Sequence, residues 1–373
     1  MTLQAFVHRV AMRAPDDVSG LEALMAAGTV DPASVVAIFG KTEGNGCVND
    51  FTRGFAVRAL QDALKQRRAV GAPDAVNLVM SGGTEGALSP HMVIFETREV
   101  ASPAEDGALA VGHARTPPLP FEGLGRLKQV DDVAEGVRAA MASAGLSSAA
   151  DVHFVQIKCP LLTADRIAEI EARGLTAPTR DTLKSMALSR AASALGVAVA
   201  LGEVDRARID DASIGRDWSL FSSCASASAG VELLDHEIVM LGSANHWAGP
   251  LRIAHCVMGD AIDVDPVREA LASLGLKSSG QLPPIARERV VALLAKAEAS
   301  STGEMRGFRH TMLNDSDISS TRHARSFVAG ALAGLIGHAQ IYVSGGAEHQ
   351  GPDGGGPVAV IARRLPEQEG ARS

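Results

Sequence analysis

The hydrophobic positions of this 373-residue chain fall into short apolar runs separated by amphipathic segments. Helix-like spacing of apolar residues alternates with β-rich runs, a pattern that predicts an α/β protein. The expected helices span residues 18–27, 130–144, 182–199 and 266–274, with two further helices that carry Arg53 and Arg322. The expected strands span residues 35–39, 76–80, 152–157, 290–294 and 339–343.

The same local order recurs three times along the chain. In each copy a β-rich run leads to a lysine, a helix carries an arginine, and a second run leads to a serine. The three sets are Lys41, Arg53 and Ser81; Lys158, Arg190 and Ser228; and Lys296, Arg322 and Ser344. Such recurrence predicts three concatenated similar α/β repeat units, over residues 1–101, 112–249 and 254–373.

Each serine begins a short motif, Ser-x-Gly-x-Glu. Two glycines follow Ser81 and Ser344, whereas Ala229 and Gly230 follow Ser228. A single Ser-Gly-Gly is typical of a tight turn, and a single lysine after a strand is typical of a solvated strand end. The threefold recurrence argues against both interpretations, because a turn needs no matched lysine upstream.

Lysine and serine together suggest nucleophilic catalysis. Serine attacks a carbonyl only when a base removes its proton, and lysine is such a base when burial or a nearby cation lowers its pKa from about 10.4. The arginine of each set supplies a cation and a planar fork that suits a carbonyl or imide. The glycines after Ser81 and Ser344 let a ligand approach backbone N–H groups, which favours an oxyanion site. We expect each lysine to meet its serine at one rim of a sheet.

Composition narrows the class of protein. With 46% hydrophobic residues the chain can bury a large core. A net charge of −8 provides no basic surface for nucleic acid or an acidic membrane, and 3% aromatic residues argue against base stacking. The most apolar stretch, residues 327–343, is shorter than the roughly 20 residues of a membrane span. Four scattered cysteines without a Cys-x-x-Cys pair favour reduced thiols. We therefore expect a cytoplasmic protein without membrane or nucleic-acid partners, and a disordered polar tail over residues 366–373.

Longer motifs then resemble a known family. Residues 39–41, 81–86, 296–300, 310–317 and 344–351 are similar to those of the cyanuric acid hydrolase/barbiturase family. The resemblance runs from the first helix to about Arg364. It implies three α/β units with pseudo-threefold symmetry around one central site, and a homotetramer. The implied reaction opens the ring of cyanuric acid to carboxybiuret, which loses CO2 to leave biuret.

The resemblance also implies roles for individual residues. Ser228 corresponds to the nucleophile and Lys158 to its base. The substrate-binding residues are Lys41, Lys296, Ser81, Ser344, Arg53, Arg190, Arg322, Gly82, Ala229 and Gly345. No cofactor is expected for catalysis. A structural divalent cation, Mg²⁺ or Ca²⁺, is implied at Glu298 with backbone groups of Ala347, Gln350, Gly351, Pro352 and Gly355.

Two alternatives stay open at this point. One is a barbiturase that opens barbituric acid to ureidomalonate, which no residue pattern in the sequence separates from the first reaction. The other is a non-catalytic protein that binds a ring ligand on the same scaffold. An assay of products from both rings distinguishes all three hypotheses.

Overall fold

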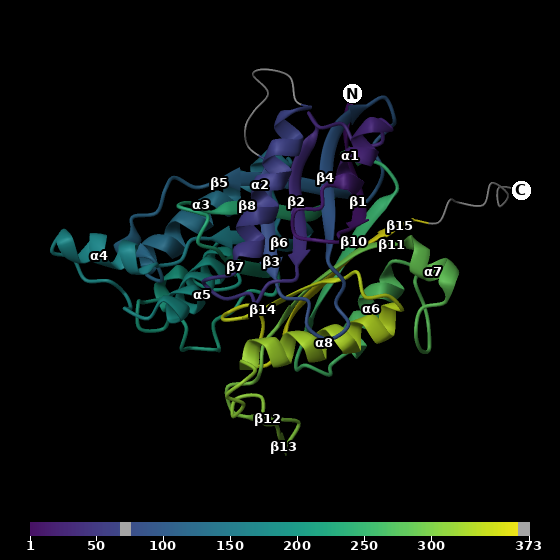
Figure 1. The fold of residues 1–373 in the computed structure, drawn as a ribbon. Coiled ribbons are helices and arrows are strands. Elements are labelled where there is room, and N and C mark those ends of the chain that lie inside the picture. Colours follow the sequence, from purple (N-terminus) through teal and green to yellow (C-terminus); the bar gives the residue numbers. More distant parts are fainter. Residues whose placement is uncertain (68–75, 365–373) are drawn as a thin grey trace, which may run out of the picture.

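The computed structural model describes residues 1–67 and 76–364, so the expected disorder of residues 366–373 lies outside the described residues. Three blocks of strands and helices follow one another along the chain (Figure 1). The first block contains β1 (Thr2–Ala11), α1 (Ser19–Ala26), β2 (Val35–Thr42), α2 (Phe51–Lys65), β3 (Asn77–Gly82) and β4 (His91–Val100). The second contains β5 (Ala108–Arg115), α3 (Leu127–Ser143), β6 (Val152–Cys159), α4 (Ala164–Ala172), α5 (Thr182–Ala200), β7 (Ala225–Ala229) and β8 (Glu237–Ala244).

The third block follows a short strand, β9 (Trp247–Ala248). It contains β10 (Leu251–Met258), α6 (Asp265–Ser273), α7 (Pro284–Arg289), β11 (Val290–Ala297), β12 (Glu304–Met305), β13 (Phe308–Arg309), α8 (Ser320–Ile336), β14 (Tyr342–Gly345) and β15 (Gly356–Arg363). β12 and β13 form a separate two-stranded ribbon.

The three blocks share one sheet topology. The strand orders are β3-β2-β4-β1, β7-β6-β8-β5 and β14-β11-β15-β10. β2, β6 and β11 occupy equivalent positions in the three sheets. Each pairs in parallel with β3, β7 or β14, and antiparallel with β4, β8 or β15, in the same order. β9 extends the first sheet by pairing in parallel with β1. The prediction of three similar α/β units is therefore confirmed.

Helix ends follow the local sequence. Asp50 is the N-cap of α2, and its side chain accepts the backbone N–H of Thr52. Asp181 caps α5 in the same way. α8 ends at Gly337, which adopts the left-handed conformation (φ 93°) that only glycine takes without steric cost. Asp50 and Asp181 thus fix where α2 and α5 begin, and Gly337 fixes where α8 ends.

The first strand of each unit escaped the sequence analysis. β1, β5 and β10 each pair antiparallel with the last strand of their own unit. In β1 the buried residues Ala5 and Val7 alternate with partly exposed ones. That period-2 pattern is the signal of a half-buried strand, and an analysis based on continuous apolar runs does not detect it.

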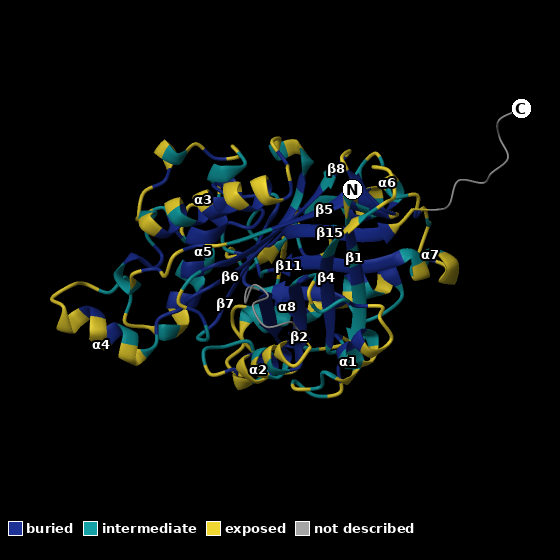
Figure 2. Ribbon diagram, turned by 90° about the horizontal axis from the view of Figure 1, so that it is seen from above, coloured by how far each residue is buried: buried dark blue, intermediate teal, exposed yellow. Residues whose placement is uncertain are grey.

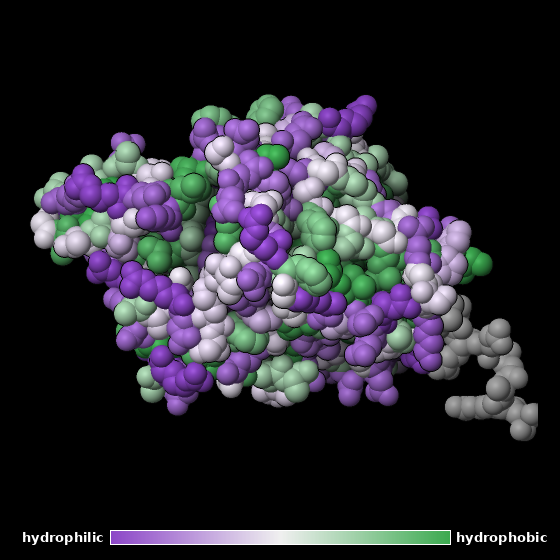
Figure 3. Space-filling model, turned by 90° about the horizontal axis from the view of Figure 1, so that it is seen from below, coloured by the Kyte–Doolittle hydropathy of each residue, from purple (hydrophilic) through white to green (hydrophobic). Residues whose placement is uncertain are grey.

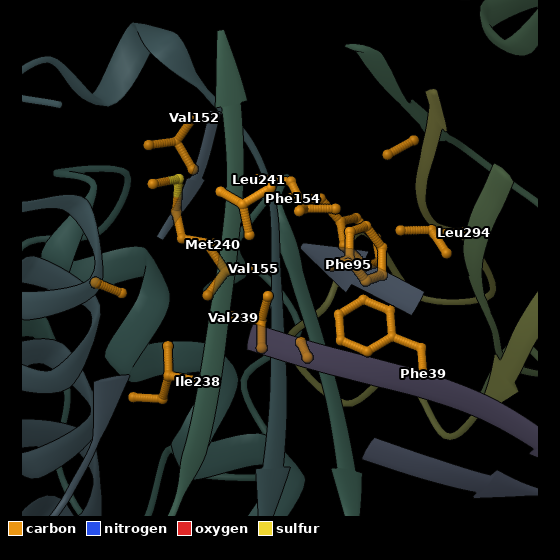
Figure 4. Close-up of a cluster of buried hydrophobic side chains, with 14 of the residues drawn as sticks. Phe39, Phe95, Val152, Phe154, Val155, Ile238, Val239, Met240, Leu241 and Leu294 are labelled. Atoms are coloured by element: carbon orange, nitrogen blue, oxygen red, sulfur yellow. The ribbon is translucent and has the colours of Figure 1, made fainter. Parts of the chain in front are cut away.

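The hydrophobic core lies where the three sheets meet. Strands occupy the buried centre and helices the periphery (Figure 2). One cluster joins Phe39 and Phe95 of the first unit, Phe154 of the second and Leu294 of the third (Figure 4). The rings of Phe39 and Phe95 lie 4.7 Å apart between centroids. Because the three units share this cluster, their sheets are held together by apolar packing rather than by flexible linkage.

The surface differs in character from this core. Figure 3 shows hydrophilic and hydrophobic side chains interleaved over the lower face of the molecule. Isolated apolar side chains such as Ile285 and Phe308 are exposed. Within residues 1–67 and 76–364, no helix has the length and apolar character needed to cross a membrane.

Candidate active site

Each sheet brings one lysine opposite one serine. The cross-strand partners in the parallel pairs are Lys41 with Ser81, Lys158 with Ser228, and Lys296 with Ser344. All six side chains are buried. The expected meeting of lysine and serine at one rim of each sheet is thus observed three times, and its cause is a shared strand register.

One small pocket lies among the three serines, and all three units contribute to it. Its lining residues are Gly46, Arg53, Ser81, Gly82, Met186, Arg190, Ser228, Ala229, Arg325, Ser344 and Gly345. Eight of the residues predicted to contact substrate or to attack it are among them. The lysines lie next to this lining and hydrogen-bond to it or to the backbone beside it. The pocket is the candidate active site.

The lysines of the first and third units contact their own serines. Lys41 Nζ donates to Ser81 Oγ at 3.2 Å. Lys296 Nζ lies 3.3 Å from Ser344 Oγ and donates to the carbonyl oxygen of Ala227 at 2.9 Å. Burial lowers the pKa of Lys41 well below its usual range, and the pKa of Lys296 to about 7.

Lys158 has different partners. Its Nζ donates to the carbonyl oxygen of Met80 at 2.5 Å and lies 3.1 Å from a carboxylate oxygen of Glu232. Burial lowers the pKa of Lys158, and the Glu232 carboxylate opposes that effect. Among the described residues no hydrogen bond joins Lys158 to Ser228, whose Oγ lies 3.1 Å from Ser344 Oγ. Catalytic hydrogen bonds often form only once substrate is present, so strand register is the relevant relationship here.

Two arginines are held by glutamates from a neighbouring unit. Arg190 on α5 donates to both carboxylate oxygens of Glu348, at 2.8 and 2.6 Å. Arg325 on α8 forms the equivalent two-point contact with Glu85. A guanidinium fixed in this way points in a defined direction, which suits recognition of a planar ligand.

The third arginine predicted from sequence to bind substrate is Arg322. Arg322 does not line the pocket; it is partly buried, and its Nη2 lies 3.9 Å from the sulfur of Cys47. Arg325, almost one helical turn further along α8, is 3% exposed and takes the expected place beside Ser81 and Ser344. Both arginines lie in the first two turns of one helix, so their order in the chain does not decide between them.

The remaining arginine, Arg53 on α2, is buried beside Ser228. It donates to the carbonyl oxygens of Ala229 at 2.7 Å and Cys47 at 2.6 Å. Its Nε lies 3.8 Å from a carboxylate oxygen of Asp50 and has no hydrogen-bond acceptor among the described residues. Arg53 thus carries donor capacity that a ligand in the pocket can use.

The expected oxyanion site needs a correction in its donors. The backbone N–H groups of Gly83, Gly230 and Gly346 already donate to carbonyl oxygens at the ends of β2, β6 and β11. A Cβ on Gly83 or Gly346 would lie within 2.7 Å of an arginine guanidinium, which explains why these positions are glycine. Amides of the residues directly after the serines, such as Ala229, are the backbone groups left to face a ligand.

Glu298, the one carboxylate among the expected cation ligands, is in contact with the expected ligand Ala347. Glu298 is partly buried and accepts the backbone N–H groups of Ala299 and Ala347. Burial and the nearby Glu348 carboxylate raise the pKa of Glu298 to about 7. Among the described residues no three His, Cys, Asp or Glu side chains are grouped to hold a metal ion. The expected ligand set relies instead on one carboxylate and backbone groups, and such oxygen donors suit a hard cation.

Three site residues had a visible signal that the sequence analysis did not use. Glu85, Glu232 and Glu348 close the repeated Ser-x-Gly-x-Glu motif, yet no role was assigned to them. The structure puts each of them in contact with an arginine or lysine of the site. The available signal was the glutamate that recurs at the last position of each motif, in a chain that also repeats a lysine and an arginine.

Comparisons with known proteins agree with this geometry. Residues 6–363 match the model of a family described as amidohydrolase ring-opening protein. A cyanuric acid amidohydrolase of Bradyrhizobium sp. (strain ORS 375) is 61% identical over 365 residues, covering 97% of this chain and 98% of the relative. The crystal structure of the cyanuric acid hydrolase from A. caulinodans has a TM-score of 0.90 at 60% identity, over 98% of this chain and 100% of that one. A second cyanuric acid hydrolase structure, described in terms of structural concatenation, has a TM-score of 0.92 at 48% identity, over 97% of this chain and 100% of that one.

Proposed function

The chain belongs to the family of amidohydrolase ring-opening proteins, and we propose that it hydrolyses a ring C–N bond of cyanuric acid. The observation that carries the proposal is the threefold set of lysine–serine pairs in register around one pocket. Cyanuric acid has three equivalent carbonyl groups, so three matched sets of donors are complementary to it. Relatives that are 61% identical are cyanuric acid amidohydrolases, which supports this substrate.

Ser228 is the proposed nucleophile and Lys158 its base. As Ser228 Oγ bonds to a ring carbonyl carbon, its proton passes to the Lys158 amine. The C–N bond then breaks, and the lysine ammonium returns the proton to the leaving nitrogen. Water attacks the acyl-serine and releases carboxybiuret, which loses CO2 to leave biuret. Buried surroundings favour the neutral amine that the first step requires.

The other two units bind and polarise the substrate in this proposal. Lys41 with Ser81, and Lys296 with Ser344, donate to the two carbonyl groups that are not attacked. Arg53, Arg190 and Arg325 direct their guanidinium groups to the ring edge, and Gly82, Ala229 and Gly345 contribute backbone. The pocket lining includes one serine from each unit, which supports contact of all three units with one substrate.

Further parts of the proposal concern the whole molecule. We assign the three repeat units to residues 1–101, 112–249 and 254–373. We further propose a homotetramer, a cytoplasmic location, which four free thiols favour, and a structural Mg²⁺ or Ca²⁺ at Glu298 with the backbone at Ala347, Gln350, Gly351, Pro352 and Gly355. The cation has no step in the reaction.

A product assay tests the proposed function directly. Purified protein incubated with cyanuric acid is expected to release biuret and CO2, with Ser228→Ala as the inactive control. If kcat/KM is higher on barbituric acid, with ureidomalonate as product, the proposed substrate is barbituric acid and not cyanuric acid. If neither ring yields product while both raise Tm, the protein is a ring-ligand binder and the proposed function is wrong.

A further inference from the structure

The glutamates of the three Ser-x-Gly-x-Glu motifs follow a cyclic pattern that is broken once. Glu85 of the first unit holds Arg325 of the third, and Glu348 of the third holds Arg190 of the second. By the same pattern Glu232 of the second unit would hold Arg53 of the first. It lies instead 3.1 Å from Lys158 Nζ, within its own unit.

The surroundings of the second glycine position in each motif differ in the same way. A Cβ on Gly83 would meet the Arg325 guanidinium, and one on Gly346 would meet that of Arg190. At the equivalent Gly230 the neighbouring group is the carboxylate of Glu232, 2.4 Å from the Cβ position. Glu232 therefore lies where the other two units have an arginine.

Lys158 is consequently distinct from its two counterparts. Among the described residues it is the one lysine of the three that forms an ion pair. The other charged or titratable groups that act on it are Arg53 from α2, Cys159 beside it on β6, and Glu237 opposite it on β8. The hydrogen bonds of Lys41 and Lys296 go to serine hydroxyl and backbone carbonyl groups. In the described part of the chain, carboxylates act on both lysines without forming an ion pair with them, Glu85 on Lys41 and Glu348 on Lys296.

We propose that Glu232 is a positioning residue for catalysis: its carboxylate holds the Lys158 amine and keeps it basic enough to take the proton of Ser228. The inference rests on the proposed function, because it assigns Glu232 a part in that reaction. Glu85 and Glu348 form their direct ion pairs with arginines, and they act on Lys41 and Lys296 only from a greater distance.

The physical reason lies in what burial does to an amine. Burial alone disfavours the ammonium form and makes a lysine a weak base, and the positive Arg53 adds to this effect. A general base works best when its pKa lies near the working pH. A carboxylate 3.1 Å away stabilises the ammonium that appears when Ser228 loses its proton, so it offsets part of the cost of burial.

The test compares three equivalent substitutions, Glu232→Gln, Glu85→Gln and Glu348→Gln, by the pH dependence of kcat/KM on cyanuric acid. Glu232→Gln is expected to move the acidic limb to lower pH by about one to three units, since the ammonium of Lys158 loses its opposite charge. Its kcat on the plateau is expected to fall by about 10- to 100-fold. The two matched variants are expected to raise KM, because an arginine loses its partner, and to leave the limb in place.

Further measurements separate positioning from simple structural damage. Circular dichroism and Tm identify any variant that fails to fold. Glu232→Asp keeps the negative charge, so the acidic limb of its pH profile is expected to lie close to that of the unmodified protein. In a Lys158→Ala background, Glu232→Gln is expected to add little further loss. An unmoved limb in Glu232→Gln, or an equal shift in all three variants, would overturn the inference. Retained activity in Ser228→Ala would instead overturn the proposed nucleophile, so the two failures are distinguishable.

Discussion

The hydroxyl oxygens of Ser228 and Ser344 lie 3.1 Å apart across the boundary between the second and third units. Two serines from different sheets therefore share one reaction space, although only one is proposed to attack. Ser228→Ala is expected to lower kcat by about 10³-fold or more, as the loss of a nucleophile does. Ser344→Ala is expected mainly to raise KM.

Steady-state kinetics of the two alanine variants, with Ser81→Ala as a third, measures this difference. The three variants remove the same atom from equivalent positions, so folding effects should be similar and visible in Tm. If Ser344→Ala or Ser81→Ala lowered kcat as much as Ser228→Ala does, the assignment of Ser228 as the nucleophile would be contradicted.

Arg325 rather than Arg322 is expected to bind substrate. Arg325→Lys keeps the charge but loses the planar two-point fork, so KM is expected to rise by about 10- to 100-fold, the value of one to two charge-assisted hydrogen bonds. Arg322→Lys is the matched control on the same helix, and its KM is expected to stay close to that of the unmodified protein. If Arg322→Lys raised KM more than Arg325→Lys does, Arg322 would be the substrate-binding residue.

Stability is expected to fall with rising pH because of Glu237. This carboxyl group is buried on β8, accepts the backbone N–H of Leu78 at 3.0 Å, and has its pKa raised by burial to about 7. In the unfolded chain it ionises near pH 4.3. Between these two values the folded state binds the extra proton, so the free energy of unfolding decreases as pH rises and levels off above about pH 7.

Urea denaturation of Glu237→Gln from pH 5 to 8 measures this contribution. The amide keeps an acceptor for Leu78 but does not ionise, so the variant is expected to gain at most about 3 kcal/mol relative to the unmodified protein over this range. Glu99→Gln, at an exposed position of β4, serves as the control without such a gain. Parallel pH profiles for all three proteins would contradict the assignment.

Removal of divalent cations is expected to lower Tm. A cation at Glu298 binds the folded state alone, so 100-fold excess over Kd adds about 2.7 kcal/mol of stability. Thermal melts in EDTA and after return of Mg²⁺ or Ca²⁺ measure it. Glu298→Gln is expected to abolish the response, whereas Glu304→Gln, at an exposed carboxylate nearby, is expected to keep it. A Tm independent of both ions would rule out the site.

Much of the fold was predictable because its signals are local. Apolar spacing identified most helices and the central strands, as with the helix expected over residues 182–199, which is α5. The first strands of the three units, β1, β5 and β10, were missed. In β1 buried and partly exposed residues alternate, so no continuous apolar run identifies that strand. Recurrence in the chain also identified the lysine–serine pairs, since each pair lies on neighbouring strands of one repeated unit.

The choice between Arg322 and Arg325, and the partners of the three glutamates, had no such local signal. They depend on contacts between residues far apart in the chain, and for Glu85 and Glu348 the partner lies in another unit, as in Arg190 with Glu348. The sequence by itself determined three α/β units, each with a lysine, an arginine and a serine in fixed order. Only the packing of the three sheets around one core decided which side chains meet in the pocket, and it set Lys158 apart by giving it Glu232 as a partner. The physical reason is that strands and helix caps depend on interactions between neighbouring residues. The pairing of buried charges depends instead on how whole sheets pack against one another.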